Sequence, residues 1–232
     1  MKKLKKILNF QKSNIGIFIS LFILDLGFRL IINSEINYYG ITKLSPSLFT
    51  ASFIFLIIGL LSFMKIKYRK ITYLIINTSM MIITYFEYLI LKKESSFVSV
   101  TNIFSFDLGK LFSYTDFKII LVITISLLIS LVTVYFMNQE KDKIKDKLDI
   151  FILILIIIIL VGGCRGGATM MLGSEIINNK KLEINAKSIY LHDIDNNKRM
   201  KVTGLYEYLF LELKDDIINQ FKYNEKRIKD YY

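Results

Sequence analysis

Five long apolar runs, separated by short and mostly basic connections, dominate the hydrophobic pattern of this chain. A hydrocarbon core about 30 Å thick requires ~20 apolar residues per helix, with ~17 at the lower end of the usual range. The pattern therefore predicts five transmembrane helices, at residues 15–33, 47–64, 71–91, 117–137 and 148–163. The expected fold is all-α: a five-helix transmembrane domain over residues 1–164, followed by a short helical extracytoplasmic tail over residues 165–232.

The tail has a different pattern, in which polar and apolar residues are mixed. Apolar side chains recur near 3.6-residue spacing within residues 204–221, which predicts an amphipathic helix. Residues 223–232 are charged and are also expected to be helical. Residues 176–190 fit an amphipathic helix or a loop, and residues 193–198 fit a turn. So short a segment is marginal as an independent fold, and we expect it to rest on the membrane surface or on another domain.

Composition supports the membrane assignment, because 53% of the residues are apolar while the formal net charge is +11. A basic balance often indicates nucleic acid as the partner. Here much of the charge lies next to apolar runs, so membrane lipids with anionic headgroups are the expected partners and nucleic acid is not.

Loop charge predicts the orientation. Thirteen Lys and Arg side chains lie in the N-terminal segment and in the loops after the second and fourth runs, against four in the alternate loops. The positive-inside rule then places the N-terminus in the cytoplasm and the tail outside, in a multi-pass protein of the cell membrane. The basic N-terminal segment resembles the start of a signal peptide, but no small-residue cleavage site follows, so we interpret the first run as a retained anchor.

Two ionisable residues, Asp25 and Arg29, lie within the first predicted span. Their four-residue spacing places them on one face of a helix, where they can pair. Charged side chains at this depth are costly and usually face a bundle interior or a polar cavity. One interpretation is contact with a lipid phosphate or a sugar hydroxyl; the other is an internal ion pair that sets the packing of the span.

Glu87 is the third candidate for contact with a lipid or polymer. It lies near the outer end of the third predicted span, within Tyr85-Phe-Glu-Tyr88. It can bind a headgroup hydroxyl or pair with Arg29, which we expect at a similar depth. The alternative is simple exposure at the membrane interface.

Residues that carry catalysis are scarce. The single histidine, His192, lies beside Asp193 with no further ligands in view, so a polar turn is the expected structure, and we expect no metal or other cofactor on this chain. We also expect no catalytic residue.

The segment Val161-Gly-Gly-Cys164 resembles a lipoprotein processing signal, in which the cysteine is lipidated. The simpler interpretation treats the glycines around Arg165 as a flexible exit from the membrane.

The order of these parts resembles the N-terminal membrane portion of the lipoteichoic acid synthase family, which are phosphoglycerol transferases of the alkaline phosphatase/sulfatase superfamily. The similar segments are Ser45-Pro-Ser-Leu-Phe49, Tyr85–Tyr88 with Ser95-Ser-Phe-Val-Ser-Val100, Phe104-Ser-Phe-Asp107, Gly204-Leu-Tyr-Glu-Tyr208 and the charged residues 225–232. The resemblance covers nearly the whole chain through short motifs.

The resemblance implies a membrane anchor and lipid-recognition module, with phosphatidylglycerol as the lipid. In that family a linker leads to a large extracellular catalytic domain. The family's nucleophilic threonine and its metal ligands have no counterpart in residues 1–232, so a separate sulfatase-type catalytic domain is an expected partner. The chain would then be one half of a split enzyme, a truncated paralogue or an excised domain. The alternative function is a polytopic membrane protein unrelated to polymer synthesis, such as a transporter component or an assembly partner.

Overall fold

The computed structural model describes residues 12–36, 44–97, 107–139, 147–172, 174–177, 180–183, 189 and 196–229. Within these ranges, five helices are long and apolar enough to cross a membrane, which confirms the five predicted spans. They are α2 (Lys12–Ile36), α3 (Ser45–Ser62), α4 (Ile66–Glu94), α6 (Phe117–Gln139) and α7 (Lys147–Met170). A short turn of helix, α5 (Leu108–Leu111), and a 3₁₀ turn, η2 (Phe112–Tyr114), precede α6.

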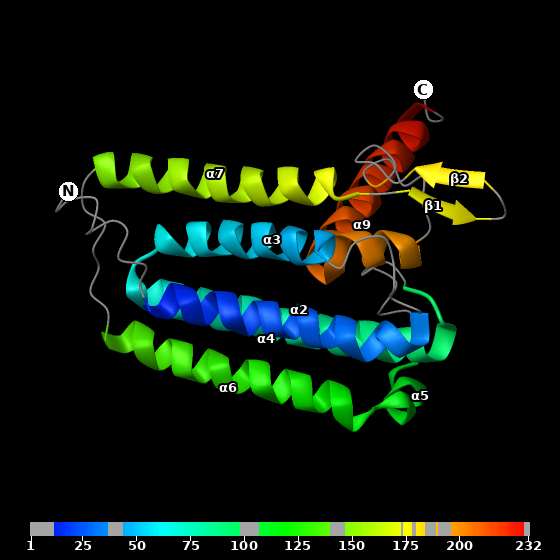
Figure 1. The fold of residues 1–232 in the computed structure, drawn as a ribbon, viewed down its shortest axis with the longest axis horizontal. Coiled ribbons are helices and arrows are strands. Elements are labelled where there is room, and N and C mark those ends of the chain that lie inside the picture. The colour runs from blue at the N-terminus through cyan, green and yellow to red at the C-terminus, as the bar shows by residue number, and fades with distance from the viewer. Residues whose placement is uncertain are drawn as a thin grey trace.

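The five long helices alternate in direction and lie side by side (Figure 1). One end of the bundle holds the start of α2 and the connection between α3 and α4; we call it the basic end, because Lys65, Lys67, Arg69 and Lys70 lie there. The opposite end holds the C-terminal segment of the chain, and we call it the tail end (Figure 1).

Small residues bring α2 and α6 into close contact. A Cβ placed on Gly16 would lie 2.2 Å from Thr133 Oγ1, and one on Gly27 would lie 2.7 Å from Val122 Cγ1. Between these two points, Ser126 Oγ donates a hydrogen bond of 2.9 Å to the Ser20 carbonyl oxygen. Close approach through small residues and interhelical hydrogen bonds is how helices associate in lipid, where there is no hydrophobic driving force between them.

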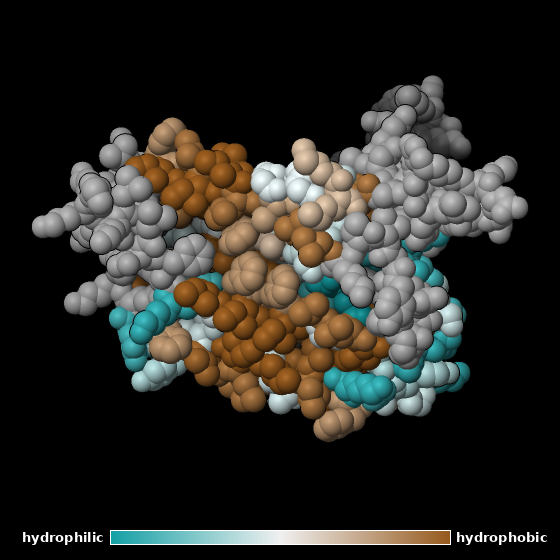
Figure 2. Space-filling view, in the orientation of Figure 1, coloured by the Kyte–Doolittle hydropathy of each residue, from teal (hydrophilic) through white to brown (hydrophobic). Residues whose placement is uncertain are grey.

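The outer faces of the bundle are apolar, as a lipid environment requires. Leu128 on α6 is 57% exposed, and Ile158 on α7 is 64% exposed. Figure 2 shows this as an apolar band across the middle of the molecule, with hydrophilic residues gathered toward the two ends of its lower half.

The fifth helix extends further than the sequence predicts. α7 continues through Gly162, Gly163, Gly166 and Gly167 to Met170, so the expectation of a flexible exit at these glycines is wrong. The physical reason lies in the backbone: at membrane depth its N–H and C=O groups have no water to bond, and the helix satisfies them internally despite the low propensity of glycine. Cys164, a free thiol, lies inside this helix, and its lipidation stays a prediction.

The tail contains a hairpin and a long broken helix. Strand β1 (Ser174–Ile177) pairs antiparallel with β2 (Lys180–Glu183), in a register that joins Ser174 to Glu183, where we expected a helix or loop. Helix α9 (Asn196–Lys229) includes the predicted amphipathic helix and the described part of the charged segment after it. Its backbone is non-helical at Gly204, where φ is 75° and ψ is 173°.

Some expectations lie outside the described residues. These are the turn at His192 and Asp193, the N-terminal lysines before Lys12, the loop lysines 141–145, and the motif residues 98–100 and 104–106. They stay predictions.

Candidate functional site

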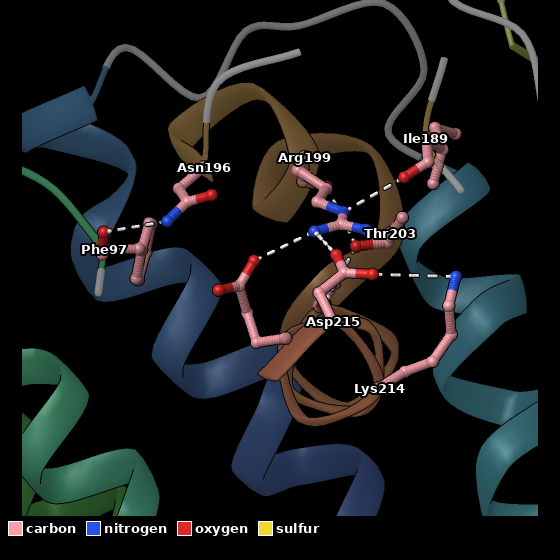
Figure 3. A network of polar contacts seen from close by, with 9 residues as sticks. Phe97, Ile189, Asn196, Arg199, Thr203, Lys214 and Asp215 are labelled. Carbon is pink, nitrogen blue, oxygen red and sulfur yellow. Dashed lines mark hydrogen bonds and ion pairs between the residues drawn. The ribbon is translucent and has the colours of Figure 1, made fainter. Parts of the chain in front are cut away.

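Helix α9 is bent into a V at the tail end. Its first arm, residues 196–203, is tied to the end of α4: the Phe97 amide donates to Asn197 Oδ1 at 3.0 Å, and Asn196 Nδ2 donates to the Phe97 carbonyl oxygen at 3.4 Å (Figure 3). Gly204 forms the vertex, and the second arm runs from residue 205 to 229. In Figure 1 the vertex lies against the bundle, and the second arm leads away from it obliquely past the end of α7.

Asp25 holds the vertex. Its Oδ1 accepts a 2.8 Å hydrogen bond from the backbone N–H of Leu205, the first residue of the second arm. Its Oδ2 accepts bonds from Arg29 Nε at 2.9 Å and from Thr50 Oγ1 at 2.7 Å. The first N–H groups of a helix lack partners within the helix, and a carboxylate is favoured beside them. Asp25 of α2 therefore acts as an N-cap for the second arm of α9, supplied from another helix.

Only glycine fits the vertex. The Gly204 dihedral angles fall in a region that residues with a Cβ essentially do not occupy. A Cβ there would also lie 2.9 Å from Thr50 Oγ1 and 3.1 Å from the Pro46 carbonyl oxygen. The absent side chain is what lets α9 turn sharply and approach α3 closely.

The residues after Gly204 each contact the bundle. Tyr206 Oη donates a 2.6 Å hydrogen bond to the Leu21 carbonyl oxygen of α2. Glu207, fully buried, pairs with Arg165 of α7 at 2.6 Å. Tyr208 packs on the Phe97 ring, with centroids 5.6 Å apart. Together with the Leu205 cap, the whole segment Gly204–Tyr208 is engaged with the bundle.

The start of α3 faces the vertex of α9. Ser45 Oγ donates a 3.0 Å bond to the Val202 carbonyl oxygen of the first arm, and Ser47 Oγ accepts one of 3.1 Å from Arg29 Nη2. Pro46 lies in the first turn of the helix, where its fixed φ is favourable and its missing N–H costs nothing. We call the surface made by Leu21, Asp25, Arg29, Ser45–Thr50 and Arg165 the tail socket.

Arg199 clamps the two arms of the V together. This guanidinium is fully buried on the first arm, and its Nη1 lies 2.9 Å from both Glu212 Oε1 and Asp215 Oδ2 of the second arm. Its Nε donates to the Ile189 carbonyl oxygen at 3.1 Å. Figure 3 shows Arg199 enclosed by Ile189, Thr203 and Asp215. Such a buried charge cluster specifies one mutual position of the two arms, because either partner left alone would be costly.

Glu87 lies on the α4 side of α9 and is fully buried. Neither of its carboxylate oxygens has a hydrogen-bond partner among the described residues. Tyr208 and Glu212 of α9 carry polar groups that interact electrostatically with Glu87. A buried carboxylate without a donor is unusual and marks a functional candidate.

The three residues proposed from sequence, Asp25, Arg29 and Glu87, thus all lie on bundle helices near α9. The Asp25–Arg29 pair expected from helical spacing is present, with Nη2 and Oδ2 2.8 Å apart. Of the alternatives considered for Glu87, pairing with Arg29 is not found among the described residues, and exposure at the interface does not occur, because Glu87 is buried. Contact of any of the three with lipid or polymer stays a prediction.

Sequence reasoning missed the contribution of the tail. Arg199, Glu207 and Glu212 appear in sequence as ordinary charges on an amphipathic segment, and Arg165 as part of a flexible exit. A usable signal was the isolated glycine followed by two tyrosines in an otherwise helical pattern, because such a glycine marks a break or a close approach.

Within the described residues, no group of three or more His, Cys, Asp or Glu side chains is placed to hold a metal ion. The fold and socket define a polytopic helical membrane protein whose C-terminal helix is seated on the bundle. No protein-family model, no curated protein and no solved structure matches this chain.

Proposed function

We propose that this chain is the membrane anchor and lipid-recognition module of a lipoteichoic acid synthase-like system. The observation that carries the proposal is the meeting of two segments on which the resemblance rests. Ser45–Phe49 and Gly204–Tyr208 are far apart in sequence, yet Gly204 closely approaches the Pro46 carbonyl oxygen. Ser45 bonds to Val202, two residues before Gly204.

An anchor of this kind must fix the direction in which its tail leaves the membrane. Asp25 and Arg165 hold α9 on the bundle by charged contacts, and Arg199 holds the two arms of α9 together. These contacts constrain the position of α9 more narrowly than apolar packing alone. The second arm then presents a separate sulfatase-type catalytic domain at a set position relative to the membrane. The tail end faces the outside in this proposal, in keeping with the cations at the basic end.

Glu87 is the residue that we assign to lipid recognition. Asp25 and Arg29 already bond each other and the socket, whereas neither carboxylate oxygen of Glu87 has a hydrogen-bond partner in the part of the chain that the structure describes. Hydroxyl groups of a glycerol headgroup supply the missing donors. Glu87 is fully buried, so a lipid headgroup reaches it only when the residues packed around it move.

Native mass spectrometry with phosphatidylglycerol and phosphatidylcholine tests this assignment. We expect Glu87→Gln to lower the preference for phosphatidylglycerol, because the amide supplies one acceptor oxygen in place of two. Glu94→Gln, at an exposed glutamate seven residues along the same helix, is the matched control and should leave it unchanged. An unaltered preference in Glu87→Gln would refute the assignment.

We expect the purified chain alone to release no diacylglycerol from phosphatidylglycerol in the presence of a divalent metal. Release should occur only when a sulfatase-type domain is added. Metal-dependent release by this chain alone, free of contaminating enzyme, would reveal an active site that we have not identified.

One observation favours the alternative, a transporter component. Transporters use broken membrane helices whose half-helix N-termini face anionic substrates, and α9 is broken at Gly204 with its N-terminus toward a carboxylate. That carboxylate belongs to Asp25, however, so the position of a substrate is already occupied by the protein. Substrate uptake by proteoliposomes that depends on Gly204 would favour the transporter.

A further inference from the structure

The vertex of α9 lies at membrane depth. At ~1.5 Å per residue, Asp25 is about 20 Å along α2 from Lys12, and Thr50 is about 18 Å along α3 from Ser62. Both distances start at the basic end of the bundle. Since the hydrocarbon core is about 30 Å thick, the Gly204 vertex that contacts both residues lies roughly 10 Å below the tail-end boundary of the core.

Protein groups satisfy the backbone at this vertex. Asp25 accepts the Leu205 N–H, and Ser45 donates to the Val202 carbonyl oxygen. Non-helical backbone is tolerated at membrane depth only where it is buried in protein or lines a water-filled cavity. The vertex meets the first condition, so the segment can remain inside the membrane.

The second arm carries an apolar stripe that no part of the described structure covers. Phe210, Leu213 and Ile217 follow the i, i+3, i+7 pattern of one helix face and are 46%, 42% and 52% exposed. Glu212 and Asp215 lie on the opposite face, where they meet Arg199 of the first arm. The arm is therefore polar toward the rest of the tail and apolar on the side away from it.

We propose that the second arm of α9 lies in the lipid–water interface at the tail end, with Phe210, Leu213 and Ile217 against lipid acyl chains. Phe210 is about 9 Å and Ile217 about 20 Å along the helix from the vertex. Because the arm leaves the bundle obliquely, its rise toward water is smaller than these lengths (Figure 1). The stripe thus starts within the core and continues at the headgroup boundary, where amphipathic helices bury their apolar face.

The surroundings of the apolar stripe favour lipid as the group that covers it. The vertex is seated among membrane spans, and the adjacent end of α7 also exposes apolar side chains, Met170 at 88% and Met171 at 39%. The second arm passes this end of α7 (Figure 1), and both expose apolar side chains there. The tail is then a re-entrant element with an interfacial arm, and this inference holds whether or not the lipid is phosphatidylglycerol.

The chain contains no tryptophan, so a single introduced Trp reports its own surroundings. Ile217→Trp is the probe and Asn219→Trp is the matched control: both positions are exposed, but they differ by about 200° around the helix. Each variant is reconstituted into phosphatidylcholine vesicles with or without acyl-chain bromines. We expect Ile217→Trp to show a blue-shifted emission maximum, strong bromine quenching and weak iodide quenching, and Asn219→Trp to show the reverse.

Phe210→Trp provides a second probe, expected to be quenched by more deeply placed bromines than Ile217→Trp. Equal emission and equal quenching at positions 217 and 219 would overturn the proposal, because the arm would then project into water. A blue-shifted Ile217→Trp that bromines do not quench would also overturn it, since protein and not lipid would cover the stripe.

Discussion

At the scale of single residues, Asp25 stabilises three elements at once: it pairs with Arg29 on α2, accepts from Thr50 on α3 and caps α9 at Leu205. Removing one partner of a buried ion pair typically costs ~3–5 kcal/mol. Asp25→Ala should therefore lower the thermal midpoint in detergent more than Arg29→Ala, because it also leaves the Leu205 N–H and the Thr50 hydroxyl without an acceptor.

The double variant Asp25→Ala/Arg29→Ala separates a simple pair from the cap. In a simple pair, removing both charges restores much of the stability. Here we expect only partial recovery, because the Leu205 N–H and the Thr50 hydroxyl remain without an acceptor in the double variant. Full recovery in the thermal melts would show that Asp25 does not cap α9.

Gly204 provides the second residue-level prediction. Gly204→Ala should destabilise the seated tail by about 1–3 kcal/mol, because alanine is strained at these dihedral angles and its Cβ meets Thr50 and Pro46. Gly163→Ala is the control, in a helical position where a Cβ meets nothing within 4 Å. Limited proteolysis of the tail checks both, and equal cleavage of the two variants would contradict the tight vertex.

At the scale of elements, the ion pairs of Arg199 fix the position of one arm of α9 relative to the other. Arg199→Met should separate the arms, because Glu212 is left as a buried charge without its guanidinium. Lys214→Gln is the control, because the Lys214 ammonium is partly exposed and makes a longer contact of 3.7 Å with the Asp215 carboxylate. Such a pair contributes little to stability. A larger distance between spin labels on the two arms in Arg199→Met alone supports the clamp, and an unchanged distance would refute it.

The long helices were predictable because apolar runs specify spans locally: the predicted ends lie within five residues of the observed ones, except at the end of α7, which lies seven residues further on. The position of α9 on the bundle could not be predicted from the sequence. Its key bond joins a side chain at residue 25 to a backbone N–H at residue 205, and a backbone donor leaves no mark in the sequence. The glycines of α7 were misjudged for a related reason: their propensity argues for a loop, whereas lipid surroundings make an unpaired backbone costlier than the low propensity of glycine.

At the scale of the whole molecule, orientation is the open prediction. With Cys164 replaced by alanine, a cysteine at Asn219 should react with a membrane-impermeant maleimide on intact cells. A cysteine at Lys65 should react only after permeabilisation, because the basic end lies inside. The reverse labelling pattern would invert the topology.

The central claim is that residues 204–208 are seated in the bundle through Asp25. Hydrogen–deuterium exchange of the wild-type protein in nanodiscs measures this most directly, because amides held in a buried socket open rarely. We predict strong protection of the peptide that covers residues 204–211, greater than that of residues 213–219, and loss of that protection in Asp25→Ala. Rapid exchange of residues 204–211 in the wild type, at the rate of an unstructured peptide, would contradict the account.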